Sequence, residues 1–179
     1  MRILKRLLGF IASRMLMITV VSALLIIAFY LAMNTANIWV LISDGLDARA
    51  GVVLMDGDEG ALQNYFRQEF LAQDAVLQVG LSDSSPYRDY EIRGYDHRVK
   101  MVYVWSWPWE NVARAEVVES IPAIDGTIRS SKREAALAEG GEERLSPPKW
   151  ATSRYRVTLV RTAGRWKISN LQLIEQVDG

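Results

Sequence analysis

The chain has 179 residues, and its 21 basic and 21 acidic side chains balance to a formal net charge of zero. This balance argues against general nucleic-acid binding, which requires a basic surface. The sequence has no Cys, which excludes disulfides and thiolate chemistry, and its single His excludes a His-rich metal site. The length allows one domain of ordinary size with an appendage.

A membrane-spanning helix is the strongest signal in the sequence. No charged residue occurs from Met15 to Ile42, and the most apolar part, Met15 to Met33, is 19 residues long. At about 1.5 Å per residue, a helix of this length matches the hydrocarbon core of a bilayer. It is apolar on every face, unlike a helix on the surface of a soluble protein. We therefore predict a transmembrane helix over residues 15–42, with Trp39 in an interfacial aromatic belt.

The charges on either side of the span predict its orientation. Residues 1–14 carry four basic residues and no acidic one, whereas residues 44–59 carry five acidic residues and one basic residue. The positive-inside rule then predicts a cytoplasmic basic tail at residues 1–14 and an extracytoplasmic domain at residues 43–179 of a single-pass protein of the cell membrane. Ala48-Arg49-Ala50 fits a signal-peptide cleavage site, but its distance from an unusually long apolar core favours an uncleaved anchor.

Helices are predicted directly after the span. Apolar residues recur at intervals of three and four over residues 38–53, as in a helix that continues from the span or restarts after Gly45. Asp58 is a good N-cap for a second helix that runs to about Ala72. Three large apolar residues would share one face of that helix: Leu62, Phe66 and Phe70.

Strands are predicted in the second half of the chain. They are expected at residues 87–93, 97–107, 111–121, 150–161 and 165–176, and polar and apolar residues alternate over 97–107 and 150–161. Thr162-Ala163-Gly164 supplies a hairpin turn between the last two strands. Residues 126–149 are highly charged and poor in large apolar groups, which predicts a long flexible loop with room for a short helix at 131–139. The whole pattern predicts an α+β fold, with two helices packed on a curved antiparallel sheet.

Helices followed by long antiparallel strands that end in GRWKISNLQLIEQ resemble the nuclear-transport-factor-like superfamily, which has a cone-shaped α+β fold. The resemblance covers residues from about 46 to 177, and the hairpin from Tyr155 to Ile168 is its most specific part. With a transmembrane helix ahead of it, the chain is similar to the bitopic assembly factors of type IV secretion and conjugation machines and to extracytoplasmic domains of conjugation and sporulation channels. The superfamily contains isomerases, dehydratases and non-catalytic modules, so the fold does not choose a function.

A row of aromatic residues is the most unusual local sequence. On a regular strand Tyr103, Trp105 and Trp107 share one face, while Pro108 marks a strand end and moves Trp109 out of register. Packing in the core beneath the helices is the favoured role, because large rings bury much area. A partner interface and a small-molecule pocket are the alternatives.

His97 is the one candidate for acid–base chemistry. Its neighbour Asp96 would point to the opposite face of a strand, so the two side chains are not expected to act together. A structural or surface role for His97 is favoured, since a single titratable group without a placed partner is thin support for catalysis.

The sequence identifies no catalytic residue, metal site or cofactor. Three functional hypotheses remain. The preferred one is a non-catalytic scaffold of a bacterial envelope complex, with the lipid bilayer and other envelope proteins as partners and self-association as a further option. The second is a ligand-binding or catalytic cone-shaped domain with an aromatic cavity. The third is a small subunit whose span packs against another helix through Ala28 and Ala32, which have small-xxx-small spacing.

Overall fold

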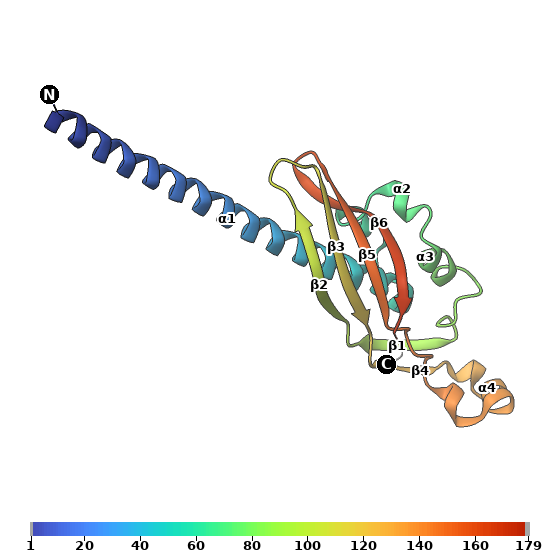
Figure 1. Ribbon diagram of the computed structural model, residues 1–179. Coiled ribbons are helices and arrows are strands. Elements are labelled where there is room, and N and C mark those ends of the chain that lie inside the picture. The colour runs from blue at the N-terminus through green and yellow to red at the C-terminus, as the bar shows by residue number, and fades with distance from the viewer. Residues whose placement is uncertain (1, 178–179) are drawn as a thin grey trace.

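One helix, α1 (Arg2–Met55), runs without a break through the predicted span and into the folded domain (Figure 1). The computed structural model describes the backbone of residues 2–177 and the side chains from residue 9 onward. The basic side chains predicted in the tail at Arg2, Lys5 and Arg6 therefore lie outside the described part. Residues 9–26 are exposed on all sides, and α1 is long and apolar enough to cross a membrane.

Gly45 does not interrupt α1, so the continuous helix is the correct one of the two predicted alternatives. A Cβ atom on Gly45 would lie 3.0 Å from the Cβ of Tyr65 and 3.3 Å from the Cδ1 of Ile168. The missing side chain lets α1 approach the rest of the domain closely, which offsets the low helix propensity of glycine.

The folded domain covers one face of α1 from Ile27 onward. Ile27 and Tyr30 are half-buried, and the side chains that follow on the same face are fully buried. These buried positions recur at intervals of four: Asn34, Ile38, Ile42, Leu46 and Ala50. The amphipathic stripe predicted for residues 38–53 is thus confirmed, and the last third of the predicted span 15–42 faces protein on this side.

The second predicted helix is broken into two short pieces, so the prediction of one helix from Asp58 to Ala72 is wrong. The 3₁₀ helix η1 (Glu59–Asn64) is followed by α2 (Gln68–Leu71), and the gap between them pairs with the last strand. The amide of Arg67 donates to the carbonyl of Ile168 over 2.8 Å, and the amide of Ile168 donates to Tyr65 over 2.8 Å. A further helix, α3 (Ala75–Gly80), follows. Asp58 does cap η1, by accepting a hydrogen bond from the amide of Gly60.

Two antiparallel sheets form the second half of the domain, which confirms the α+β fold class. A four-stranded sheet has the order β2 (Arg98–Ser106), β3 (Val112–Ser120), β5 (Ser153–Thr162) and β6 (Arg165–Gln176). A two-stranded sheet pairs β1 (Tyr90–Tyr95) with β4 (Ile124–Ile128). The predicted hairpin between β5 and β6 is present, and its two turn residues, Ala163 and Gly164, have positive φ angles of 49° and 79°.

The core lies between one face of the four-stranded sheet and the C-terminal half of α1. Alternate residues of β3 and β5 point into it, as the period of a half-buried strand requires. The largest buried cluster contains residues from α1, the short helices and the sheet, among them Ile38, Ile42, Leu46, Leu62, Phe66, Val117, Val157, Leu159 and Ile168.

Residues 126–149 do not form the long loop that was predicted. They contain the end of β4, the 3₁₀ helix η2 (Ser130–Lys132), α4 (Arg133–Gly140) and the 3₁₀ helix η3 (Gly141–Leu145). Helix α4 confirms the short helix predicted at 131–139, and this lobe projects from the end of the domain that lies farthest from the N-terminus (Figure 1). The hydroxyl of Tyr90 ties it to the domain by donating to the carbonyl of Arg144 over 3.1 Å. Its flexibility stays a prediction.

Candidate functional site

The aromatic row on β2 lies outside the core, so the favoured prediction of core packing is wrong. The exposed fractions of Tyr103, Trp105, Trp107 and Trp109 are 50%, 53%, 39% and 71%. A β-bulge between Met101 and Tyr103 is the physical reason. One extra residue on a strand reverses the face of every residue beyond it, so Met101 packs against the core while Tyr103 and Trp105 point away.

The three Trp rings form one continuous row at the end of the β2–β3 hairpin. The ring centres of Trp105 and Trp107 are 6.0 Å apart and nearly parallel, and those of Trp107 and Trp109 are 5.4 Å apart. We call Trp105, Trp107 and Trp109 the Trp row. The rings of Trp105 and Trp107 stack, the ring of Trp109 is tilted by 56° against that of Trp107, and all three leave much of their area accessible.

A polar junction joins this end of the sheet to α1. Asn34 is buried on α1, and its amide nitrogen donates to the hydroxyl of Ser106, at the end of β2. Its Oδ1 accepts from the indole Nε1 of Trp166 over 2.7 Å and from Arg161 over 3.3 Å. The guanidinium of Arg161 also lies 4.4 Å from the centre of the Trp166 ring, a cation–π distance.

His97 is buried between two carboxylates, neither of which belongs to Asp96. Its Nε2 lies 3.1 Å from Oε1 of Glu119, which is fully buried on β3, and its Nδ1 lies 3.6 Å from Oδ1 of Asp47 on α1. Asp96 instead pairs with Arg98 on the surface. The prediction that Asp96 and His97 do not act together is confirmed. With a side chain only 6% exposed, His97 lies inside the domain rather than on its surface.

A second buried ion pair connects α1 to α3. The guanidinium of Arg49 donates to both carboxylate oxygens of Asp74, over 2.6 Å and 3.0 Å, and both side chains are almost fully buried. Burial disfavours the charge, but the hydrogen bond and the attraction of Asp74 outweigh it and raise the pKa of Arg49. Asp74 also caps α3 by accepting from the amide of Val76 over 3.0 Å.

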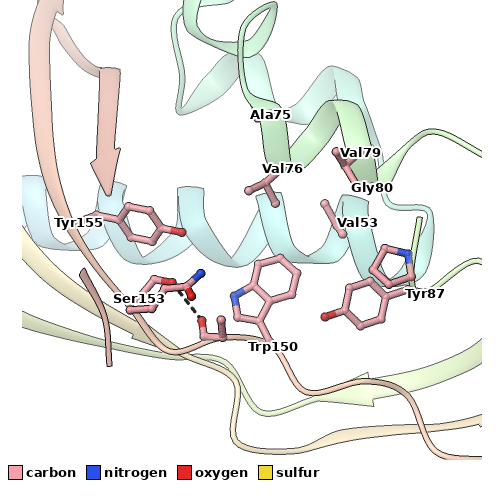
Figure 2. Close-up of a pocket in the computed structure, with 12 residues that line it drawn as sticks. Val53, Ala75, Val76, Val79, Gly80, Tyr87, Trp150, Ser153 and Tyr155 are labelled. Atoms are coloured by element: carbon pink, nitrogen blue, oxygen red, sulfur yellow. Dashed lines mark hydrogen bonds between the residues drawn. The ribbon is translucent and has the colours of Figure 1, made fainter. Parts of the chain in front are cut away.

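A pocket of about 360 Å³ lies where β5 begins and β6 ends, at the other end of the domain from the Trp row. Figure 2 shows the residues that line it. The end of α1, helix α3 and the segment before β5 enclose it, with Trp150 and Tyr87 stacked 6.1 Å apart on one side. Its walls are mostly apolar, from Val53, Val76 and Val79, with the hydroxyls of Ser153 and Tyr155 at one end. This size and lining fit a small apolar ligand.

The structure brings none of the predicted aromatic residues to this pocket. Tyr103 and Trp105 lie on the outer face of the sheet, Trp107 and Trp109 lie in the β2–β3 turn, and His97 is held beside Glu119. The aromatic walls come from Tyr87 and Trp150, which carry no local motif that the sequence analysis could recognise. Burial raises the pKa of Tyr87, in keeping with the apolar surroundings of its ring.

The outer face of the sheet is charged beyond the Trp row. Glu116 on β3 accepts hydrogen bonds from Arg154 over 3.0 Å and from Arg156 over 3.3 Å. The hydrogen bond from Arg154 makes the largest contribution to lowering the pKa of Glu116, and the hydrogen bond from Arg156 makes the next largest. A third strand joins the group through Glu175, which pairs with Arg154 over 3.2 Å. This face therefore changes from paired charges to exposed aromatic rings along the length of the strands.

Comparison with protein-family models, curated proteins and solved structures finds no match to this chain.

Proposed function

We propose that the chain is a membrane-anchored, non-catalytic scaffold of a bacterial envelope complex of the secretion, conjugation or sporulation type. One observation carries this proposal: α1 is both the apolar segment that can cross a membrane and the central helix of the domain core. Such a continuous helix fixes the domain at a set height and angle to the bilayer. An assembly protein requires such a fixed position relative to the membrane, whereas an enzyme on a flexible tether does not.

The orientation follows from charge, with the basic N-terminal tail in the cytoplasm and the folded domain outside. Burial supports an anchor that is not removed, since Arg49 and Ala50 lie fully inside the domain on α1. Cleavage at this site would separate the buried residues Ile38, Ile42 and Leu46 from the rest of the core. The sheet and the α4 lobe would then bind other envelope proteins.

Single Cys residues can test the topology, because the chain has none of its own. We would place one at Ser13 in the tail and one at Gln172 on the sheet, both exposed positions. A membrane-impermeant maleimide applied to spheroplasts should label Gln172→Cys and spare Ser13→Cys, and lysis should expose both. The reverse pattern would overturn the orientation. Release of the full-length chain by carbonate washing would overturn the anchor itself.

Partner binding has its own test. The full-length protein, extracted in mild detergent, should migrate in a complex larger than its own monomer or dimer and give the same defined cross-links from repeated preparations. Deletion of residues 130–145, which removes η2, α4 and η3, tests the lobe as a contact. A monomer free of cross-links from every exposed site would contradict the scaffold function.

The pocket favours a second candidate, the binding of a small apolar or amphipathic ligand. A panel of aliphatic and aromatic carboxylates would be scored by the rise in unfolding temperature of the protein in nanodiscs. Val76→Trp should fill the pocket and abolish any rise, whereas Val40→Trp, at an exposed site on α1, should not. A rise that survives Val76→Trp would remove the pocket from consideration.

A further inference from the structure

We propose that the Trp row is a second membrane contact, seated in the interfacial layer of the bilayer that α1 enters. This inference rests on the proposed membrane anchor and adds to it a surface of the folded domain. Three independent observations support it: the level of the row along α1, the exposure of its rings, and the change in polarity along the sheet face.

The level of the row follows from contacts between β2 and α1. Near the start of β2, the hydroxyl of Tyr95 donates to the carbonyl of Asp47 over 3.1 Å. At the other end, Ser106 bonds to Asn34, and the carbonyl of Pro108 lies 3.4 Å from the hydroxyl of Tyr30. Strand β2 therefore runs back along α1 toward its N-terminus, as the hairpin in Figure 1 shows.

Tyr30 belongs to the most apolar stretch of the chain, Met15 to Met33. A hairpin end held beside Tyr30 is consequently held where the hydrocarbon core of the bilayer gives way to the headgroups. Trp107 and Trp109 flank Pro108, so the contact that fixes Pro108 also sets the height of these two rings. The domain cannot move away from this layer without breaking the junction at Asn34.

The chemistry of the row suits this layer better than water. Tryptophan has a large apolar ring and one N–H donor, and it concentrates where apolar chains meet headgroups. Trp109 is 71% exposed, so most of its ring is free to contact lipid. Farther along the strands from the Trp row, the outer face of the sheet carries the paired charges of Glu116, Arg154 and Arg156. Such a charged surface is suited to water rather than to lipid.

A second hairpin end lies beside the row and adds a charge that fits lipid headgroups. The amide of Arg161 donates to the carbonyl of Asn111 over 2.8 Å, which holds the β5–β6 end next to the β2–β3 end. Arg165, just after the turn, is exposed. A guanidinium at this height can reach lipid phosphates while the Trp rings lie deeper.

The absence of Cys allows a direct test with nitroxide labels at single introduced Cys residues. The full-length protein would be placed in vesicles of phosphatidylethanolamine and phosphatidylglycerol, and collisions with oxygen and with a water-soluble nickel chelate would be compared at each site. The sites are Trp109→Cys in the row, Lys100→Cys near the start of β2, and Leu24→Cys in the span; all three are exposed.

We expect collisions with oxygen to exceed collisions with the nickel chelate at positions 24 and 109. At position 100, collisions with the nickel chelate should exceed those with oxygen by several-fold. Oxygen access at position 24 with nickel access at position 109 would overturn the membrane contact of the Trp row but would still support the membrane anchor. Nickel access at all three positions would overturn both the membrane contact of the Trp row and the membrane anchor. A label at 109 that is shielded from both reagents would mean that a protein covers the row, which also overturns the inference.

A second set of variants keeps the row intact, because labelling position 109 removes one of its rings. Glu110→Cys, at the exposed residue after the row, should report the interfacial layer when all three Trp residues are present. Replacing Trp105, Trp107 and Trp109 together by Ser should shift that label toward nickel access. An unchanged label would overturn the Trp row as a membrane contact, because the contacts with α1 would then account for the height of the hairpin without it.

Discussion

The indole nitrogen of Trp166 donates a buried hydrogen bond of 2.7 Å to the side chain of Asn34, which joins the last strand to the helix that leaves the apolar span. In the sequence, Asn34 marks the point where apolar character ends. In the folded chain it also accepts from Arg161 and donates to Ser106, so two hairpin ends converge on one amide. The apolar part of α1 and the folded domain are thus joined directly at Asn34.

Asn34→Leu should therefore destabilise the folded domain. The substitution leaves the buried Trp166 indole and the Ser106 hydroxyl without their partner, at a cost of about 1–3 kcal/mol. Thermal unfolding of the detergent-solubilised protein would measure it. Asn37→Leu, at an exposed position on the same helix, is the matched control and should change little. Equal stability of the two variants would contradict the role given to Asn34.

Asp74→Asn tests the buried pair between α1 and α3. Asparagine preserves the cap of α3 but leaves the Arg49 guanidinium buried without its counter-charge, which should cost about 3 kcal/mol or more. Unfolding in urea would measure the loss.

The double variant Arg49→Met with Asp74→Asn separates charge from packing. Removing the unpaired guanidinium should restore much of the stability, because a buried ion pair can often be replaced by apolar packing at little cost. If the double variant is no more stable than Asp74→Asn, uncompensated charge is not the cause of the loss.

Local patterns predicted much of this fold correctly. The stripe over residues 38–53, the strand at 165–176 and the turn at Ala163-Gly164 all depend on the spacing of neighbouring residues, and all are present. The break in the second helix depends instead on Ile168, about a hundred residues away, which captures the backbone at residues 65–67. Sequence periodicity has no information about such a partner.

The candidate sites depended even more on long-range pairing. One bulge after Met101 placed the Trp row outside the core, and a bulge leaves no clear mark in a strand that otherwise alternates. Glu119 reaches His97 only because β2 and β3 pair in a particular register. No pattern in the sequence predicts that Arg49 and Asp74 pair, and only the packing of α3 on α1 brings them together.

Gly80→Ala should weaken the packing of α3 on α1. A Cβ atom at this position would lie 2.8 Å from both Cγ atoms of Val53, too close for ordinary contact. We expect a loss of about 1–3 kcal/mol, even though alanine favours helices. Gly94→Ala is the control, because a Cβ there has no atom within 4 Å. In a chain that already carries Val53→Ala, Gly80→Ala should lower the free energy of unfolding by less. An equal loss in both backgrounds would show that the contact with Val53 is not the cause.

Tyr95 should make stability fall at alkaline pH. Burial, with a contribution from nearby Asp47, raises the pKa of Tyr95 from 10.0 to about 12. Its contribution is complete below pH 10 and is lost as the pH rises toward 12, because the unfolded chain releases the proton first. Urea unfolding across this interval should show a smaller loss for Tyr95→Phe than for the parent protein. Parallel pH profiles would show that Tyr95 does not contribute.

Ala163→Asn should stabilise the β5–β6 hairpin. Ala163 has a φ of 49°, in the left-handed region that costs a residue with a Cβ atom roughly 1 kcal/mol or more. Asparagine tolerates this region well, and Asn-Gly is a favoured pair for a two-residue hairpin turn with positive φ at both positions. A gain of up to about 1 kcal/mol is expected in thermal or urea unfolding.

Thr162→Asn provides the comparison for that variant, because it introduces the same side chain at the exposed last residue of β5, where φ is not positive. It should give no gain, since asparagine has low strand propensity. Ala163→Asn that is no more stable than Thr162→Asn would mean that the turn is not strained at Ala163. A gain confined to Ala163→Asn would support the hairpin register that places Trp166 beside Asn34.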